Sequence, residues 1–282
     1  MKQYTCLFFL ILSSTFAFAQ TNENIANGRN YGNFEIGDTS FTLVADANIR
    51  DKPATSGAVV AKLTIGTPLK IENTTTDSLT IKGVRAPWYQ VSFMSDNKKK
   101  TGYLWGGFIA SVFIHNVYGD NELYLGGLAS FDEKNFKLVT QLRIAKNGQQ
   151  LAALEFPTCG DVSYSPVLEL NGDCGFTNVK QAISYGANFG ACDYPNGEYL
   201  LFWTKNNQLQ HIFATTSSSG AGTGYASENY ILPSQRGGIN NHILYTEDSA
   251  AMEEKGESFV IRDQKYKVVL WKWNGTKLVK VQ

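Results

Sequence analysis

The chain has no excess of charge of either sign. Its 282 residues carry 25 Lys and Arg against 25 Asp and Glu, which gives a formal net charge of +0. The densest basic cluster is residues 98–100 (KKK), which lies between two strand-like runs and is therefore interpreted as a hairpin tip. A nucleic-acid-binding surface needs a wider basic patch, so we expect no nucleic acid partner.

Histidine is scarce as well. His115, His211 and His242 are the only three, and their positions do not match the ligand spacing of metal sites. Carboxylates are scattered without an acid–base pair, and the glycine-rich residues 220–224 lack the lysine of a phosphate loop. We therefore expect no metal, no cofactor and no catalytic residues, so that the protein is not an enzyme.

Long apolar runs are absent beyond the N-terminus. Lys2 precedes a short apolar run at residues 6–12, and Ala17-Phe18-Ala19 has the small-residue pattern of a cleavage site. This order predicts a signal peptide over residues 1–19, with a mature chain that begins at Gln20. We expect an exported protein, periplasmic or extracellular, without a membrane span.

Helical periodicity is almost missing, since residues 247–257 are the one plausible helical turn. Residues 20–40 are rich in Asn and Gly and are interpreted as a flexible lead-in. From residue 41 onward, short runs rich in Val, Ile, Thr, Tyr and Phe alternate with turn residues. This spacing predicts an all-β chain.

Four clusters follow one another between residues 41 and 111. They are residues 47–53 (ANIRDKP), 59–66 (VVAKLTIG), 88–91 (WYQV) and 102–105 (GYLW). In order and spacing they resemble a bacterial SH3-like (SH3b) domain, a small β-barrel that usually binds ligands. Residues 74–85 form a longer insertion than many family members carry, and the overlapping residues 73–79 are expected to form a polar loop.

The resemblance implies a peptide or other extended ligand bound at the barrel. Arg50 and Asp51 begin the long loop that often borders the ligand groove in this family, or form a local ion pair. Side chains alternate along a strand, so Tyr103 and Trp105 point outward together if Leu104 points inward. Tyr89 is a further candidate contact. Trp105 has an alternative role, which is to pack against the domain that follows.

Residues 112–282 are expected to form a larger antiparallel β domain, either a sandwich or a propeller-like meander. Three hairpins share a turn built on asparagine, at Asn147-Gly148, Asn206-Asn207 and Asn274-Gly275. Asn-Gly favours the positive φ angles of a type I′ turn. Residues 215–227 are rich in Ser and Gly and are expected to form a mobile loop.

Three cysteines follow the predicted signal peptide, at positions 159, 174 and 192. In an antiparallel meander Cys159 and Cys192 fall in turns at one end of the sheet and Cys174 at the other. A disulfide requires Cα atoms within about 7 Å. The sequence therefore predicts a Cys159–Cys192 disulfide and a free Cys174.

One enzymatic alternative remains open. The segments 173–176 (DCGF) and 195–202 (PNGEYLLF), followed by His211, resemble in order the motifs of papain-like cell-wall peptidases. The serine that follows the family's cysteine is missing, and the Cys174-to-His211 spacing is shorter than in the family. In this alternative His211 activates the Cys174 thiol as the nucleophile.

These features predict an exported, non-catalytic protein whose barrel binds peptidoglycan peptides or another envelope partner. The C-terminal domain then serves as a scaffold or as a second binding surface. The alternatives are the cysteine peptidase and a structural protein whose barrel docks only onto its own C-terminal domain. The sequence leaves the oligomeric state open.

Overall fold

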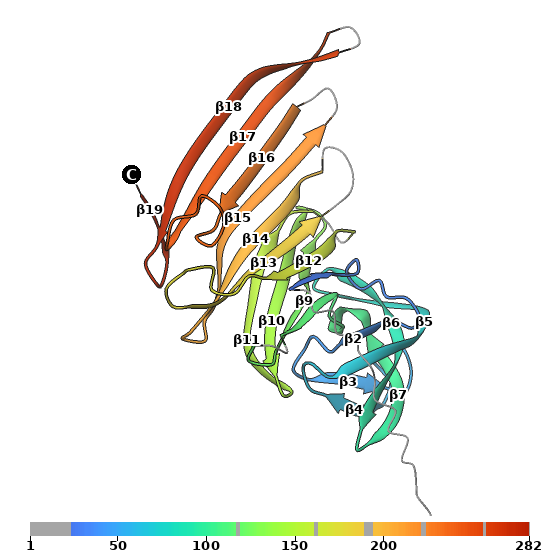
Figure 1. The fold of residues 1–282 in the computed structure, drawn as a ribbon. Coiled ribbons are helices and arrows are strands. Elements are labelled where there is room, and N and C mark those ends of the chain that lie inside the picture. The colour runs from blue at the N-terminus through green and yellow to red at the C-terminus, as the bar shows by residue number, and fades with distance from the viewer. Residues whose placement is uncertain are drawn as a thin grey trace, which may run out of the picture.

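The computed structural model describes residues 24–116, 119–160, 163–188, 194–220, 224–255 and 258–281. These residues form three antiparallel sheets and a single short 3₁₀ helix, so the predicted all-β class is confirmed. Figure 1 shows a small barrel at one end and a long sheet that extends away from it at the other. In the described part of the chain, no helix has the length and apolarity needed to cross a membrane.

The barrel is a six-stranded sheet with the order β2-β5-β6-β7-β3-β4. Its elements are β2 (Thr39–Phe41), β3 (Ala47–Arg50), β4 (Val59–Leu63), β5 (Pro68–Ile81), β6 (Val84–Ser95), β7 (Lys98–Trp105) and the 3₁₀ helix η1 (Gly106–Phe108). Alternate side chains fill its interior, among them Ile49, Val91 and Leu104, which are fully buried. Leu104 therefore points inward, which is the condition under which Tyr103 and Trp105 were expected to point outward.

The insertion at residues 74–85 differs from the expected polar loop. Residues 73–79 are part of β5, which pairs with β6 as far as Ile81 and Val84, and the turn falls at Lys82 and Gly83. Register shifts between Ile71 and Ser78 bend the hairpin. The loop prediction was wrong because cross-strand pairing, which local polarity does not report, extends the two strands.

The second domain contains two sheets. The smaller one has the order β11-β10-β9-β8 and is built from β8 (Val112–Asn116), β9 (Glu122–Asp132), β10 (Lys137–Lys146) and β11 (Gln149–Thr158). Asn147 and Gly148, both at positive φ, close the hairpin between β10 and β11 as the type I′ pattern predicted.

The larger sheet has nine strands in the order β1-β12-β13-β14-β15-β16-β17-β18-β19. After β1 (Ile25–Asn27) its strands are β12 (Ser165–Leu170), β13 (Val179–Asn188), β14 (Asn196–Thr204), β15 (Leu209–Gly220), β16 (Gly224–Ile231), β17 (His242–Lys255), β18 (Ser258–Trp273) and β19 (Leu278–Lys280). From β12 onward the strands follow chain order, as in a meander. Two expectations are corrected here: the described residues of 247–257 lie in β17 and not in a helical turn, and the described residues of 215–227 lie in β15 and β16 and not in a mobile loop.

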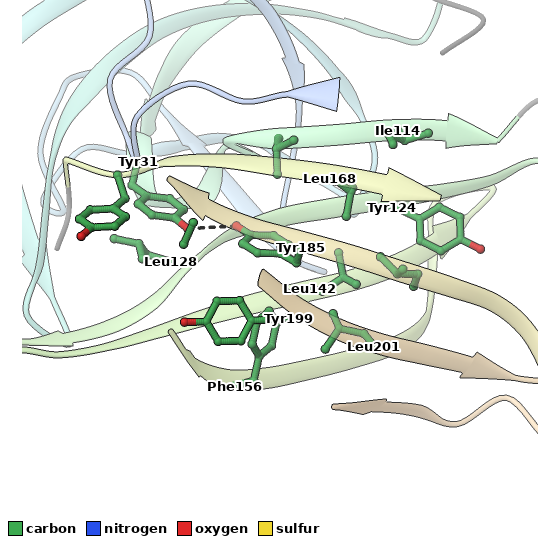
Figure 2. Packing of buried hydrophobic residues seen from close by; sticks show 14 of the residues in the cluster. Tyr31, Ile114, Tyr124, Leu128, Leu142, Phe156, Leu168, Tyr185, Tyr199 and Leu201 are labelled. Carbon is green, nitrogen blue, oxygen red and sulfur yellow. Dashed lines mark hydrogen bonds between the residues drawn. The ribbon is translucent and has the colours of Figure 1, made fainter. Parts of the chain in front are cut away.

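The main core lies between these two sheets and includes Leu142 of β10, Leu168 of β12 and Leu201 of β14 (Figure 2). The two sheets thus form a sandwich at this end, while β16 to β18 project beyond it (Figure 1). A second cluster covers the opposite face of the large sheet and includes Cys174, Leu200, Phe202 and Trp273.

The predicted flexible lead-in is ordered over its described residues. β1 pairs with β12, Tyr31 is buried in the main core, and Phe34 is buried in the barrel core. The Tyr31 hydroxyl lies 3.1 Å from the Tyr185 hydroxyl (Figure 2). Few apolar residues are present in this segment, but each of these aromatic side chains buries a large area, which offsets part of the ordering cost of its neighbours.

Candidate functional site

The long loop after β3 is the most exposed of the sequence-predicted binding features. Asp51, Lys52, Thr55 and Ser56 are exposed. The loop is closed at its base, where Arg50 Nη1 donates to the Gly57 carbonyl at 2.6 Å and the Ala58 amide donates to Asp51 Oδ1 at 2.8 Å. Arg50 and Asp51 thus hold the loop by two separate hydrogen bonds, and within the described residues they do not form an ion pair with each other.

Tyr103 lies directly beside this loop, because Arg50 of β3 pairs with Tyr103 of β7. Tyr103 is half-buried and packs against the cluster that contains Trp105. The structure therefore brings together three of the five predicted binding residues, namely Arg50, Asp51 and Tyr103, on one surface of the barrel. We call this surface, with the loop 51–58, the loop surface.

Trp105 lies elsewhere, and its predicted exposure was wrong. It is only 4% exposed, its Nε1 donates to the carbonyls of Leu79 at 2.9 Å and Ala86 at 3.1 Å, and it meets Phe108 edge to face. It belongs to the buried cluster that continues into the second domain. The alternative interpretation of Trp105, packing against the following domain, is the one the structure shows.

Tyr89 is also internal, with 1% exposure. Its hydroxyl donates to the Gly32 carbonyl at 2.7 Å and accepts from the Phe34 amide at 3.0 Å. Tyr89 therefore fastens the lead-in to the barrel and is out of reach of a ligand. No local sequence signal could have shown this, because the pattern around a strand tyrosine does not depend on whether its hydroxyl bonds a ligand or a distant backbone group.

The predicted Cys174–His211 pair is not assembled. Leu200 of β14 pairs with Phe213 of β15, whereas Leu201 pairs with His211, so the two pairs face opposite sides of the sheet. Cys174 is buried on the Leu200 side. The His211 ring lies against Phe156 and Tyr199 on the other side, with centroids 5.7 Å and 6.0 Å away.

The environment of Cys174 also opposes thiolate formation. Burial raises the pKa of the Cys174 thiol, and its Sγ donates to the Asn171 carbonyl at 3.1 Å. Burial lowers the pKa of His211, which disfavours the imidazolium that would stabilise a thiolate. Both shifts are opposite to those of an activated cysteine.

The structure describes two of the three cysteines that follow the predicted signal peptide, Cys159 and Cys174. Cys159 carries a free thiol, whose Sγ lies 3.5 Å from the Pro195 carbonyl, and Cys192 falls outside the described residues. The predicted Cys159–Cys192 disulfide is therefore not shown. Cys174 is free, as predicted. Within the described ranges, no group of three or more His, Cys, Asp or Glu could hold a metal ion.

A cavity that the sequence did not indicate lies on the large sheet, over β12 to β16. Its volume is about 280 Å³. The side chains around it include three carboxylates, Glu169, Glu198 and Glu228. Neutral hydrogen-bonding side chains are more numerous, among them Ser184, Asn188, Asn196, Thr215, Thr216 and Asn229. We call this feature the sheet cavity.

The sheet cavity forms where two strands part. β15 and β16 pair only through residues 217–220 and 224–227. Just beyond, the Thr216 amide donates to Glu228 Oε2 at 2.7 Å, so a side chain takes the place of a backbone carbonyl. The residues around the cavity come from five strands, which explains why no local motif could reveal it.

Comparison with known proteins gives one positive result. Residues 45–110 match the bacterial SH3 domain family, in agreement with the resemblance read from the four sequence clusters. The match covers the barrel from β3 to η1 and leaves β2 and the two-sheet domain outside it. Searches of curated proteins and of solved structures found no match to the chain.

Proposed function

We propose that this chain is an exported, non-catalytic binding protein whose barrel recognises a cell-wall peptide or another extended ligand through the loop surface. The observation that carries the proposal is the position of the loop 51–58. It is exposed and closed by its own hydrogen bonds, within a segment that matches the bacterial SH3 family. A closed loop loses little conformational entropy when a ligand binds.

Export is supported by the order of Lys2, the apolar run and Ala17-Phe18-Ala19, all outside the described residues. The full-length gene product is expressed in a bacterial host, and the first residue of the protein recovered outside the cytoplasm is determined by mass spectrometry. We expect Gln20. A protein that stays in the cytoplasm with its first residues intact contradicts export.

The binding test uses purified peptidoglycan sacculi and the mature chain in a co-sedimentation assay. Tyr103→Ala and Asp51→Ala are expected to weaken binding at least fivefold. Tyr266→Ala is the matched control, because Tyr266 is 67% exposed on β18, far along the sheet from the barrel. Equal binding by all variants contradicts a role for the loop surface.

A structural role is the second candidate, and a specific contact favours it. Trp105 is buried in a cluster shared with the second domain, and the Phe131 amide of β9 donates to the Lys82 carbonyl at 3.0 Å. In this role the barrel serves to complete the fold. Absence of binding to sacculi and to their soluble peptides, together with loss of the folded second domain on removal of the barrel, favours this role over ligand recognition.

A further inference from the structure

We propose that the sheet cavity is a second binding site, separate from the barrel, and that it takes a neutral sugar unit. The inference starts from the size of the cavity. Drug-sized ligands occupy pockets of about 300–1,000 Å³. A cavity of about 280 Å³ suits a smaller group, on the scale of a single sugar ring.

The side chains around the cavity determine which chemistry fits. Seven of them are neutral hydroxyls or amides, which donate and accept hydrogen bonds as sugar hydroxyls do: Ser184, Asn188, Asn196, Thr215, Thr216, Ser217 and Asn229. The described residues that line the cavity include no Lys, Arg or His. Phosphates, sulfates and carboxylates therefore find no cationic partner, which disfavours an anionic ligand.

The carboxylates do not make this a simple cation site, because the protein already occupies two of them. Glu198 accepts from the Tyr230 hydroxyl. Glu228 accepts from the Thr216 amide at 2.7 Å, and also from the Tyr245 hydroxyl at 2.8 Å. Carboxylates held in this way remain acceptors for further hydroxyl donors, since each oxygen has two lone pairs.

Glu169 is the carboxylate left for a ligand. No hydrogen bond or ion pair joins its side chain to another residue in the part of the chain that the structure describes. Burial and then the neighbouring Glu198 raise its pKa, so the site favours a neutral hydrogen-bonding partner over added negative charge. A sugar hydroxyl can donate a hydrogen bond to the ionised carboxylate and can accept one from the protonated carboxyl group.

The lining also offers some surface without polar side chains, which suits the carbon face of a ring. Val167, Gly186 and Gly197 are the apolar or side-chain-free residues of the lining. A Cβ added at Gly186 would lie 3.3 Å from Val167 Cβ and 3.4 Å from Asn188 Nδ2. Both of these residues also line the cavity, so the added methyl group would take up space beside them. Gly186→Ala thus narrows the cavity without removing a hydrogen-bonding group.

The test is ligand-observed NMR on the mature chain with four probes of one ring type. Glucose and N-acetylglucosamine are neutral, glucosamine is cationic and glucuronate is anionic. We expect a neutral probe to bind and glucuronate not to bind. Binding by glucosamine alone, or by none of the four, overturns the proposal, since the first result indicates a cation site.

Variants of the cavity test whether the NMR binding signal comes from this site. Ser184→Ala, Glu169→Gln and Gly186→Ala are each expected to weaken the neutral probe at least fivefold, with unchanged far-UV circular dichroism. Glu155→Gln is the matched control, because Glu155 is exposed on β11 of the smaller sheet. Equal weakening by Glu155→Gln, or full binding by all three cavity variants, rejects the site. The result is independent of the barrel, because Tyr103→Ala must leave sugar binding unchanged even if sacculus binding is lost.

Discussion

Gly83, at the tip of the barrel's longest hairpin, lies against the backbone of Phe131 in β9. A Cβ built at Gly83 would fall 1.7 Å from the Phe131 carbonyl oxygen, and the Phe131 amide donates to the neighbouring Lys82 carbonyl. Only glycine fits here, because the approach is too close for a side chain and φ is +79°. The insertion that departs from the family pattern is therefore one of the parts of the barrel that dock onto the second domain, beside the buried cluster that Leu43 and Ile65 form with Leu125.

Replacing Gly83 with Ala is expected to destabilise the protein by more than strain alone explains. Positive φ costs a non-glycine residue about 1–2 kcal/mol, and the collision with Phe131 adds about 1–3 kcal/mol. Gly37→Ala is the matched control, since φ is +96° there and no atom lies within 4 Å of the added carbon. Urea denaturation measures the free energy of unfolding of both variants. Equal losses of stability would contradict the prediction, because they would show that the hairpin tip moves away from Phe131 at no energetic cost.

Trp105 should behave as a core residue. Trp105→Ala is expected to lower the free energy of unfolding by about 3–5 kcal/mol, the range for large aromatic side chains in cores. Trp105→Phe keeps much of the packing but leaves the carbonyls of Leu79 and Ala86 without the indole donor, which costs about 1–3 kcal/mol. Met94→Ala, at a side chain 41% exposed, should change stability little. A Trp105→Ala variant of normal stability would contradict this assignment.

Buried tyrosines should make the fold sensitive to alkali. Burial raises the pKa of Tyr31, Tyr185 and Tyr199, so the folded state favours their neutral form. The unfolded chain ionises tyrosine near pH 10. The stability they contribute is therefore fully present below about pH 10 and is lost as the pH rises above it.

Absorbance at 295 nm and far-UV circular dichroism, followed together from pH 8 to 12.5, measure this effect. We expect part of the tyrosine absorbance change to coincide with unfolding. Tyr185→Phe should move the unfolding transition to higher pH than in the unmodified protein. The variant removes a hydroxyl group whose ionisation in the unfolded chain opposes folding, and this gain is expected to exceed the loss of the hydroxyl contact with Tyr31. Tyr266→Phe, on an exposed position, should leave the transition in place. Complete tyrosine ionisation before any unfolding would disprove the coupling.

The two described cysteines should differ in reactivity. Cys159 is half-buried and Cys174 is buried, and burial raises the pKa of both thiols, so exposure is what separates them. Iodoacetamide at pH 8 is expected to alkylate Cys159 first and to reach Cys174 only in denaturant, as peptide mapping by mass spectrometry would show. Rapid modification of native Cys174 at pH 6 would instead restore the peptidase hypothesis.

Much of the local structure was readable from the residues. The Asn147-Gly148 turn depends on near neighbours and was predicted correctly. The alternation around Leu104 was less informative, because it led to the wrong exposure for Trp105. Failures occurred where distant segments decide. Residues 73–79 form a strand because they pair with β6. The lead-in is ordered because Tyr31 is buried in the main core and Phe34 is buried in the barrel core.

The sequence by itself determined the all-β class, the Asn147-Gly148 hairpin turn and the identity of the SH3-like segment, because these follow from strand-forming composition, turn chemistry and short motifs. Tertiary structure alone decided which aromatic side chains stay reachable, which side of the sheet holds Cys174, and where β15 and β16 part. Those outcomes depend on contacts between residues far apart in the chain. Burial of Trp105 and Tyr89 has the same cause, since their hydrogen-bond partners come from β5, β6 and the lead-in.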